Sequence, residues 1–252
     1  WARVSGFGSD GPLGALPGYD AAVQAMTGLM SVNGESGGDP LRVGLPVVDM
    51  VTGMNAVIGV LLALQERHRS GRGQFVEAAL YDSGIALLHP HAANWFMDGR
   101  VPRRTGNAHP NIYPYDALRT GTDPIFLAVG NDRQFAAFCR VVGVPALAQD
   151  ADYATAGARS VNRDALKQRL EAQLAGFDGR TLVDALMAAG VPAAPVLPVD
   201  AALEHPHTAH RGMVVEMQGG YRGLRAPVKL GRTPATYRHA PLTPGEQFEP
   251  QG

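Results

Sequence analysis

The longest apolar segment of the chain, residues 43–65, contains a single charged side chain, Asp49. From residue 50 onward its large apolar residues recur at helical spacing, which predicts a helix over residues 50–69. These residues are Met54, Val57, Ile58, Leu61, Leu62 and Leu64. The segment ends on a run of basic residues followed by Gly71, the pattern expected where cations meet the negative end of a helix and glycine stops it.

The rest of the sequence before residue 100 predicts a mixture of strands and helices. The predicted elements are a short strand in WARVSGFG (1–8), a helix over 20–32 with Asp20 as its N-cap, a strand over 74–80, and a helix over 81–99 that breaks near Pro90. The chain opens in what reads as the end of a strand and has no initiator methionine. We therefore expect it to be part of a longer protein.

The pattern changes at residues 100–114, a basic and proline-rich stretch that we interpret as a domain boundary. After it, the sequence predicts a β-hairpin over 115–131, helices over 132–143, 162–177 and 179–190, an edge strand over 191–199, and strands over 213–217 and 223–230. Asp178 is a candidate N-cap for the third of these helices. The end of the chain, 232–252, has little periodicity and predicts an irregular tail.

Composition narrows the class of protein. The 252 residues carry a net charge of −1, which argues against non-specific binding to nucleic acid or to a membrane surface, since both need basic excess. Pro46, Asp49 and Gly53 interrupt the apolar segment, so we do not expect it to cross a membrane. The single cysteine, Cys139, excludes an internal disulfide, suits a cytoplasmic protein and is predicted to lie in the core.

The eight histidines raise the question of a metal site. Five of them lie in HPHTAH (205–210) and HPH (89–91), where proline interrupts each segment and acidic partners are lacking. Metal ligation needs ligands that converge with fixed geometry. We therefore predict surface turns and no metal site.

Asp49 itself has two compatible interpretations from its spacing. An aspartate before a long helix is a favoured N-cap, because its oxygen accepts a backbone N–H. A carboxylate at the positive end of a helix, with apolar neighbours that limit water, also suits a nucleophile or a general base.

The residues around Asp49 form a longer motif, GLPVVDMVTGMNAVIGVLLALQERHRSGRGQFVEAALYD. Thr52 and Gly53 follow the aspartate, and Arg67 precedes the turn GRGQ (71–74). Further matching segments are SGFGSDGP (5–12), PGYD (17–20), GNAHPNIYPY (106–115), GNDRQF (130–135) and AGVPAAPV (189–196). Together they resemble the class III CoA-transferases, also called the CaiB/BaiF family, of which formyl-CoA transferase is the best-known member.

The resemblance implies an α/β fold with a Rossmann-like large domain, only partial here, and a small α+β domain. It implies the catalytic part of the large domain in residues 1–100, the small domain in 101–205, and a return segment in 206–252. The first βα units, with much of the CoA adenine site, would precede Trp1, and a terminal helical segment would follow the chain. Full-length members form interlocked homodimers.

The activity implied by the resemblance is transfer of CoA from an acyl-CoA donor to a carboxylic acid acceptor. The Asp49 carboxylate would attack the donor thioester, giving a mixed anhydride and then an aspartyl-CoA thioester. Backbone N–H groups at the helix start are expected to stabilise the oxyanion. Coenzyme A enters as part of the substrate, and no permanently bound cofactor is expected.

The resemblance also implies contacts to CoA from Pro17, Gly18, Tyr19, Asp20 and Leu80. The alternative for PGYD is a turn with an N-cap. A loop over the site would contain Asn107 and His109, and the alternative for these two is a solvated linker turn. This loop has fewer glycines than that of formyl-CoA transferases, which argues against a formyl or oxalyl substrate.

Two other functions remain open. Racemases of the same family act on 2-methylacyl-CoA and carry a histidine where this chain has Tyr19. Racemisation needs two acid/base groups flanking the α-carbon, and a tyrosine replaces histidine poorly, so Tyr19 favours transfer. The second alternative is a non-catalytic binding protein derived from the family, against which the intact Asp49 motif argues. Succinyl-CoA is a reasonable first donor.

Overall fold

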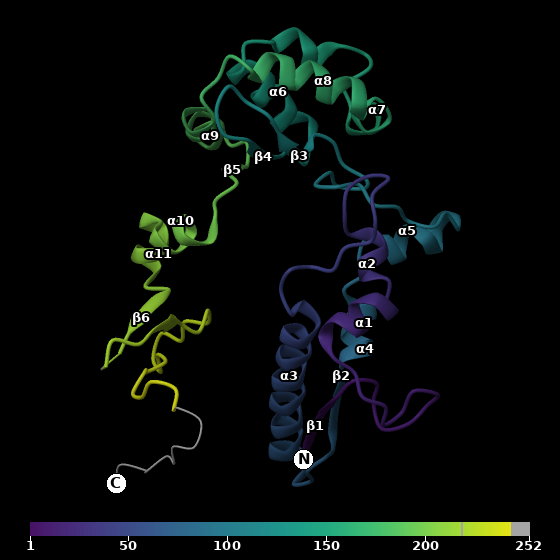
Figure 1. Ribbon diagram of the computed structural model, residues 1–252, viewed down its shortest axis with the longest axis vertical. Coiled ribbons are helices and arrows are strands. Elements are labelled where there is room, and N and C mark those ends of the chain that lie inside the picture. Colours follow the sequence, from purple (N-terminus) through teal and green to yellow (C-terminus); the bar gives the residue numbers. More distant parts are fainter. Residues whose placement is uncertain (218, 243–252) are drawn as a thin grey trace. The chain divides into compact units, whose positions relative to one another are not determined.

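A computed structural model describes residues 1–217 and 219–242, and divides the chain into two units, Trp1–Ala194 and Pro195–Gly252 (Figure 1). The first unit contains strands and helices that alternate along the chain, and the second contains short helices and a strand pair. The predicted mixed α/β class is confirmed. The division into 1–100, 101–205 and 206–252 concerns the full-length fold and stays a prediction.

The amino-terminal part of the first unit is built on two parallel strands, β1 (Ala2–Ser5) and β2 (Val76–Ala79), paired from Ala2↔Val76 to Ser5↔Ala79. Helix α3 (Val47–Ser70) belongs to the connection between them and lies alongside both strands (Figure 1). In such a crossover the helix runs antiparallel to the strands. The first turn of α3 therefore lies at the carboxyl ends of β1 and β2.

Helix α3 confirms the predicted helix and begins three residues earlier, at Val47. It ends at Gly71, whose left-handed φ of 70° lets its N–H bond to the Arg67 carbonyl at 2.9 Å. Only Val48 and Thr52 of this helix are buried. Among the described residues it is the one helix long and apolar enough to span a bilayer, a property that core helices of soluble proteins share.

The single helix predicted over 20–32 is wrong. The structure has two, α1 (Asp20–Met26) and α2 (Leu29–Val32), separated by Gly28 with a left-handed φ of 86°. A left-handed residue cannot continue a right-handed helix, and glycine adopts that conformation without a steric penalty. Asp20 is also not the N-cap of α1, because the cap position is Tyr19 and makes no side-chain cap bond.

The predicted break near Pro90 is confirmed. Helix α4 (Leu80–Ala86) follows β2 directly, and α5 (His91–Asp98) begins after the proline. Helix α4 packs closely against α1: a Cβ on Gly84 would lie 2.7 Å from the Thr27 side chain. The glycine therefore sets the distance between these two helices.

The carboxyl-terminal part of the first unit surrounds a second apolar cluster. Its sheet has the order β3 (Tyr115–Leu118), β4 (Ile125–Ala128), β5 (Ala193–Pro195), with the predicted hairpin between the first two and the proline-rich strand at the edge. Helices α6 (Asp132–Val141), α8 (Arg163–Leu174) and α9 (Gly179–Ala188) contribute the apolar residues that cover it. Two elements escaped the sequence analysis, the 3₁₀-helix η1 (Pro145–Gln149) and α7 (Ala156–Val161).

Two local predictions for this region are confirmed. The Asp178 carboxylate caps α9 by accepting the Thr181 N–H at 2.9 Å, and this bond lowers the pKa of Asp178. Cys139 is fully buried in the apolar cluster, and burial raises the pKa of its thiol to about 11.

The second unit contains α10 (Val199–Glu204), α11 (Pro206–Arg211) and the antiparallel pair β6 (Val214–Glu216) and β7 (Arg222–Leu224). The two strands match the predicted positions, but β7 is much shorter than 223–230. The prediction of surface turns for HPHTAH is wrong, because Pro206 starts a helix and His205 precedes it as the cap. Residues 232–242 form no helix or strand, as predicted, and residues 243–252 of the predicted tail lie outside the described residues.

Candidate active site

Asp49 is the third residue of α3, and its side chain is exposed. The cap position of this helix belongs to Pro46, which has no side-chain acceptor and makes no cap bond. The interpretation of Asp49 as the N-cap is therefore wrong. Within residues 1–217 and 219–242, no hydrogen bond or ion pair engages the Asp49 carboxylate.

A second carboxylate, that of Asp20, occupies the place that an N-cap side chain would fill. Its Oδ2 accepts the Val48 N–H at 2.9 Å and, over a longer 3.4 Å, the Asp49 N–H. These are the N–H groups of the second and third residues of α3, which N-cap side chains normally bind. Asp20 is only 7% exposed, so a buried carboxylate from α1 caps the helix that carries Asp49.

Gln24 extends this network and was missed by the sequence analysis. It is fully buried, and its Nε2 donates to Asp20 Oδ1 at 2.6 Å and to the Leu45 carbonyl at 3.3 Å. Its Oε1 accepts the Val43 N–H at 2.9 Å. One turn of helix separates Gln24 from Asp20, a spacing at which such pairs meet, and this was the available signal.

The expected oxyanion stabilisation by N–H groups at the start of α3 is wrong. The Val47 N–H bonds to the Leu45 carbonyl at 2.8 Å and the Met50 N–H to the Pro46 carbonyl at 3.0 Å. The two N–H groups between them are engaged by Asp20. The first turn of α3 therefore has no N–H group free to face a substrate.

The segment PGYD lies next to this network. A Cβ on Gly6 would lie 2.8 Å from the Gly18 Cα, so the loop after β1 and the PGYD segment approach as only glycines allow. Pro17 is exposed, Tyr19 is 82% exposed, and Asp20 is directed into the protein. Tyr19 thus presents its ring to solvent one residue before the capping carboxylate.

Leu80, the first residue of α4, is buried in a small cluster with Val23 and Val48. Val48 precedes Asp49 in α3, and Leu80 directly follows the end of β2. Leu80 is therefore part of the apolar cluster that includes the first turn of α3. Contacts of CoA with PGYD and with Leu80 stay predictions.

The loop that contains Asn107 and His109 is attached to the chain before α3. The Gly106 N–H bonds to the Gly34 carbonyl at 3.0 Å, and the Arg104 Nη1 to the Ser31 carbonyl at 3.1 Å. Asn107 is exposed and His109 is half-buried. Among the described residues, neither side chain makes a hydrogen bond, an ion pair or a ring contact with Asp49, so their part in the site stays a prediction.

The His109 side chain, as a neutral imidazole, accepts two backbone hydrogen bonds within this loop. Its Nδ1 accepts the N–H groups of Asn111 at 3.1 Å and Ile112 at 3.2 Å. Arg163 holds the same loop from α8, donating to the carbonyls of His109 at 3.2 Å and Pro110 at 3.1 Å. Burial, and next the Arg163 charge, lower the pKa of His109 from its ordinary 6.5.

We predict that the loop around His109 loosens when the pH falls below about 6.5. The lowered pKa means that the unfolded chain takes up this proton more readily, so the stabilisation present above the ordinary value is lost as the pH falls. Amide hydrogen exchange at Asn111 and Ile112, corrected for intrinsic rates at pH 7.5 and 5.5, measures the effect. H109Q should remove this pH dependence, whereas H91Q should keep it; equal responses of H109Q and wild type would contradict the assignment.

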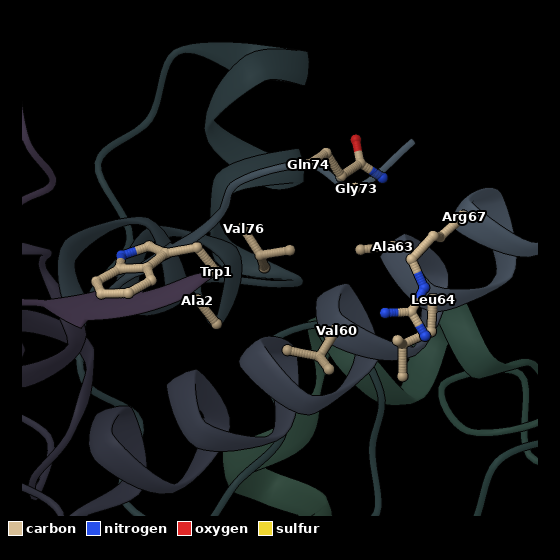
Figure 2. Close-up of a pocket in the computed structure, with 9 residues that line it drawn as sticks. All are labelled: Trp1, Ala2, Val60, Ala63, Leu64, Arg67, Gly73, Gln74 and Val76. Carbon is tan, nitrogen blue, oxygen red and sulfur yellow. The ribbon is translucent and has the colours of Figure 1, made fainter. Parts of the chain in front are cut away.

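Two hollows lie away from Asp49. The hollow in Figure 2, about 210 Å³, is lined mainly by apolar residues at the amino ends of the strands and on the second half of α3, including Val60 and Leu64. Leu64 lies about 22 Å along the helix from Asp49, given the α-helical rise. A larger cleft of about 840 Å³ is bordered by α5 and the linker, with His91, Asn94 and Arg103 in its wall. Neither contains Asp49.

Within residues 1–217 and 219–242, no group of three or more His, Cys, Asp or Glu side chains is arranged to hold a metal ion.

Comparison with known proteins agrees with the motif around this carboxylate. The chain is 36% identical over 250 residues to a succinate–glutarate CoA-transferase of Agrobacterium fabrum, covering 98% of this chain and 62% of that protein. An acetyl-CoA:oxalate CoA-transferase of Acetobacter aceti is 37% identical over 231 residues, covering 91% of this chain and 59% of that protein. The crystal structure of a CaiB/BaiF family protein from Brucella suis superposes with a TM-score of 0.77 at 36% identity, covering 92% of this chain and 61% of that one.

The chain thus spans about three fifths of the length of the relatives it matches. The sequence profile of CoA-transferase family III matches residues 1–247, almost the whole chain. By this match and by its relatives, the chain belongs to CoA-transferase family III, as the motif around Asp49 predicted.

Proposed function

We propose that the full-length protein transfers CoA from an acyl-CoA donor to a carboxylic acid, with Asp49 as the nucleophile. The observation that carries this proposal is the exposed Asp49 carboxylate, which has no bonding partner among the described residues although it lies in the first turn of a helix. It also lies at the carboxyl ends of parallel strands, the edge at which α/β proteins bind their ligands. Family membership supplies the reaction class.

The first half of the reaction loads CoA onto the protein. An Asp49 oxygen attacks the thioester carbonyl of the donor, the C–S bond breaks, and CoA leaves as a thiolate. The product on the protein is a mixed anhydride between Asp49 and the donor acid. The thiolate then attacks the aspartyl carbonyl carbon of the anhydride. The donor acid leaves as a carboxylate, and an aspartyl-CoA thioester remains.

The second half passes CoA to the acceptor. The acceptor carboxylate attacks the aspartyl carbonyl, releases the CoA thiolate and forms a second anhydride. The thiolate attacks the acceptor carbonyl, which gives the new acyl-CoA and restores the Asp49 carboxylate. No step needs a net proton transfer, which suits a site where no described base contacts Asp49.

The transfer mechanism needs no general base, and in this it differs from the reaction of a racemase of the same family. Racemisation needs a second acid/base group opposite the first. Tyr19, which stands where the racemases carry histidine, is 82% exposed, and among the described residues its hydroxyl has no hydrogen-bond partner that would activate it. We therefore propose transfer, and keep racemisation and a non-catalytic binding role as outcomes of the test.

We propose dicarboxylates as the acids exchanged. The relative from Agrobacterium fabrum is named for succinate and glutarate, which are both dicarboxylates, and the name of the relative from Acetobacter aceti pairs acetyl-CoA with oxalate. Succinyl-CoA is the donor to test first, with glutarate as the acceptor. Oxalate is the comparison acceptor, because the loop with few glycines around His109 argues against it. Pro17, Gly18 and Tyr19 are the proposed contacts of CoA, since they lie beside the capped helix start.

We also propose that the full-length protein completes a Rossmann-like large domain and forms the interlocked homodimer of its family. The exposed apolar face of α3, which includes Met54, Ile58 and Leu61, supports this, because a soluble protein rarely leaves so large an apolar surface uncovered. We propose that protein, and not lipid, covers this face.

The experiment that tests the proposed function uses the full-length protein with succinyl-CoA and an acceptor acid labelled with ¹⁸O in its carboxyl group. The mechanism moves one acceptor oxygen to Asp49, and the next turnover moves it to the released succinate. Intact-mass spectrometry without acceptor should find CoA bound to the protein, and peptide mapping should place it on Asp49.

Each result decides between the candidate functions. A CoA adduct with ¹⁸O in the released succinate supports transfer. Exchange of the α-proton of a 2-methylacyl-CoA into deuterated water, without any adduct, would overturn transfer in favour of racemisation. Binding of acyl-CoA with neither reaction would favour the binding protein.

A further inference from the structure

Two carboxylates lie at the start of α3, and one is buried whereas the other is exposed. Asp20 is 7% exposed, and both of its oxygens accept hydrogen bonds, from Val48 and Asp49 on one side and from Gln24 on the other. Asp49, one turn into the same helix, is exposed and has no such partner. The structure thus assigns the capping of α3 to one carboxylate and leaves the other unengaged.

Pro46 explains why α3 needs a capping group from another part of the chain. Proline at the cap position offers no side-chain oxygen to the N–H groups of the first turn. Left alone, those groups would attract the nearest carboxylate, because the helix start carries a partial positive charge. The usual bond from a side chain at the third helix position to the cap N–H is not available to Asp49, because Pro46 has no N–H. The targets that remain for Asp49 are the first-turn N–H groups that Asp20 now engages. Without Asp20, the first-turn N–H groups would therefore compete for Asp49.

Gln24 makes the assignment specific. Its amide donates to Asp20 Oδ1 and accepts from Val43, so the carboxylate and the segment before α3 are held in one network. Burying a carboxylate is costly unless hydrogen bonds replace water, and charge-assisted bonds to N–H groups do so. The network holds the Asp20 carboxylate against the start of α3, and correct placement of a reacting group is worth a large factor in rate.

We propose that Asp20 is a positioning residue: its carboxylate caps α3 from α1 and so leaves the Asp49 carboxylate free and correctly placed to attack acyl-CoA. The inference rests on the proposed function for its consequence in rate. Its geometric content, the capping of α3 by Asp20, is testable without any activity.

The test compares D20A and D20N with wild type in the full-length protein. The rate of CoA-adduct formation on Asp49 in a single turnover should fall about 100-fold in D20A, because the nucleophile becomes bound and misplaced. It should fall about tenfold in D20N, since an amide keeps one acceptor oxygen but turns an N–H₂ group toward Gln24 or Val48. The concentration of acyl-CoA at half-maximal rate should stay within about threefold, because the Asp20 carboxylate is buried and bonded within the protein. A contact of residue 20 with CoA would come from its backbone, which both variants keep.

Two further variants separate positioning from a general loss of stability. In D20N combined with Q24E, the amide of residue 20 can donate a hydrogen bond to the carboxylate of residue 24, which reverses the wild-type bond. The double variant should form the CoA adduct faster than D20N alone. The matched control is D178N, which alters another aspartate that caps a helix, α9, by accepting a backbone N–H. D178N should react within about twofold of wild type.

Amide hydrogen exchange provides a readout that does not depend on activity. The Val48 N–H should exchange at least about tenfold faster in D20A, because it loses its acceptor, while the Thr181 N–H keeps its rate. Unchanged exchange at Val48 would overturn the capping role. Wild-type adduct formation in D20A would overturn the positioning role, whereas an absence of adduct in the wild type itself would count against the proposed function and leave the exchange result to decide the capping.

Discussion

Replacing Asp49 by alanine is expected to abolish CoA transfer by the full-length protein, with a loss on the order of 1,000-fold or more. Each proposed step forms or breaks a bond at this carboxylate, so removing it removes the intermediates. Because the side chain is exposed and makes no hydrogen bond among the described residues, the free energy of unfolding should change by less than about 1 kcal/mol. The measurements are initial rates of acyl-CoA exchange, intact mass after incubation with succinyl-CoA, and thermal unfolding.

The matched control for Asp49 is D164A. Asp164 is also an exposed aspartate in the first turn of a helix, α8. Its replacement should leave both the adduct and the rate unchanged within about twofold. A CoA adduct that persists in D49A would show that another residue carries CoA. If D49A kept as much activity as D164A, Asp49 would have no part in the mechanism.

The second large effect concerns Arg159, which is fully buried in the carboxyl-terminal part of the first unit. Its guanidinium donates to the carbonyls of Tyr113 at 3.1 Å and Tyr153 at 2.9 Å, and to the Asp132 carboxylate at 2.7 Å. It also stacks over the Phe135 ring, with 4.5 Å from its Cζ to the ring centroid. One side chain thus joins the end of the linker, the segment before α7 and the start of α6.

R159A is expected to lower the free energy of unfolding by about 3 kcal/mol or more. The change leaves two buried carbonyls without donors and opens a cavity beside Phe135. The ion pair contributes less, because the Asp132 side chain is 57% exposed and water screens it. Urea unfolding followed by circular dichroism measures the effect.

Two variants test the reasoning about Arg159. R140A removes an exposed arginine from the neighbouring helix α6 and should cost less than about 0.5 kcal/mol. D132A removes the ion pair and keeps the carbonyl bonds, so it should cost about 1 kcal/mol or less. If D132A destabilised the protein as much as R159A, the ion pair and not the carbonyl bonds would account for the stability.

Much of the secondary structure was predictable because its signals are local. The apolar spacing of residues 54–64 and the glycine at position 71 predicted α3 and its end to within one residue, and its start to within three. Asp178 and Thr181 lie within one helical turn of each other, so the cap of α9 was visible in the sequence. The wrong predictions came where a competing local choice was possible, as at Gly28, whose left-handed conformation ends α1 in a stretch with otherwise helical spacing.

In the candidate site too, local features were predictable from the sequence and contacts between distant residues were not. The sequence by itself determined the family and the position of Asp49 in a helix start, because a motif and a periodicity are properties of neighbouring residues. Only the tertiary structure decided that Asp20 and not Asp49 caps this helix, since the bond joins residues 29 positions apart. The same holds for Arg159, a charged residue that the sequence would place on the surface and that backbone carbonyls from distant segments hold in the core. Hydrogen-bond partners that come from another part of the chain leave no local pattern, and here they determine which carboxylate is engaged within the protein and which is left without a partner among the described residues.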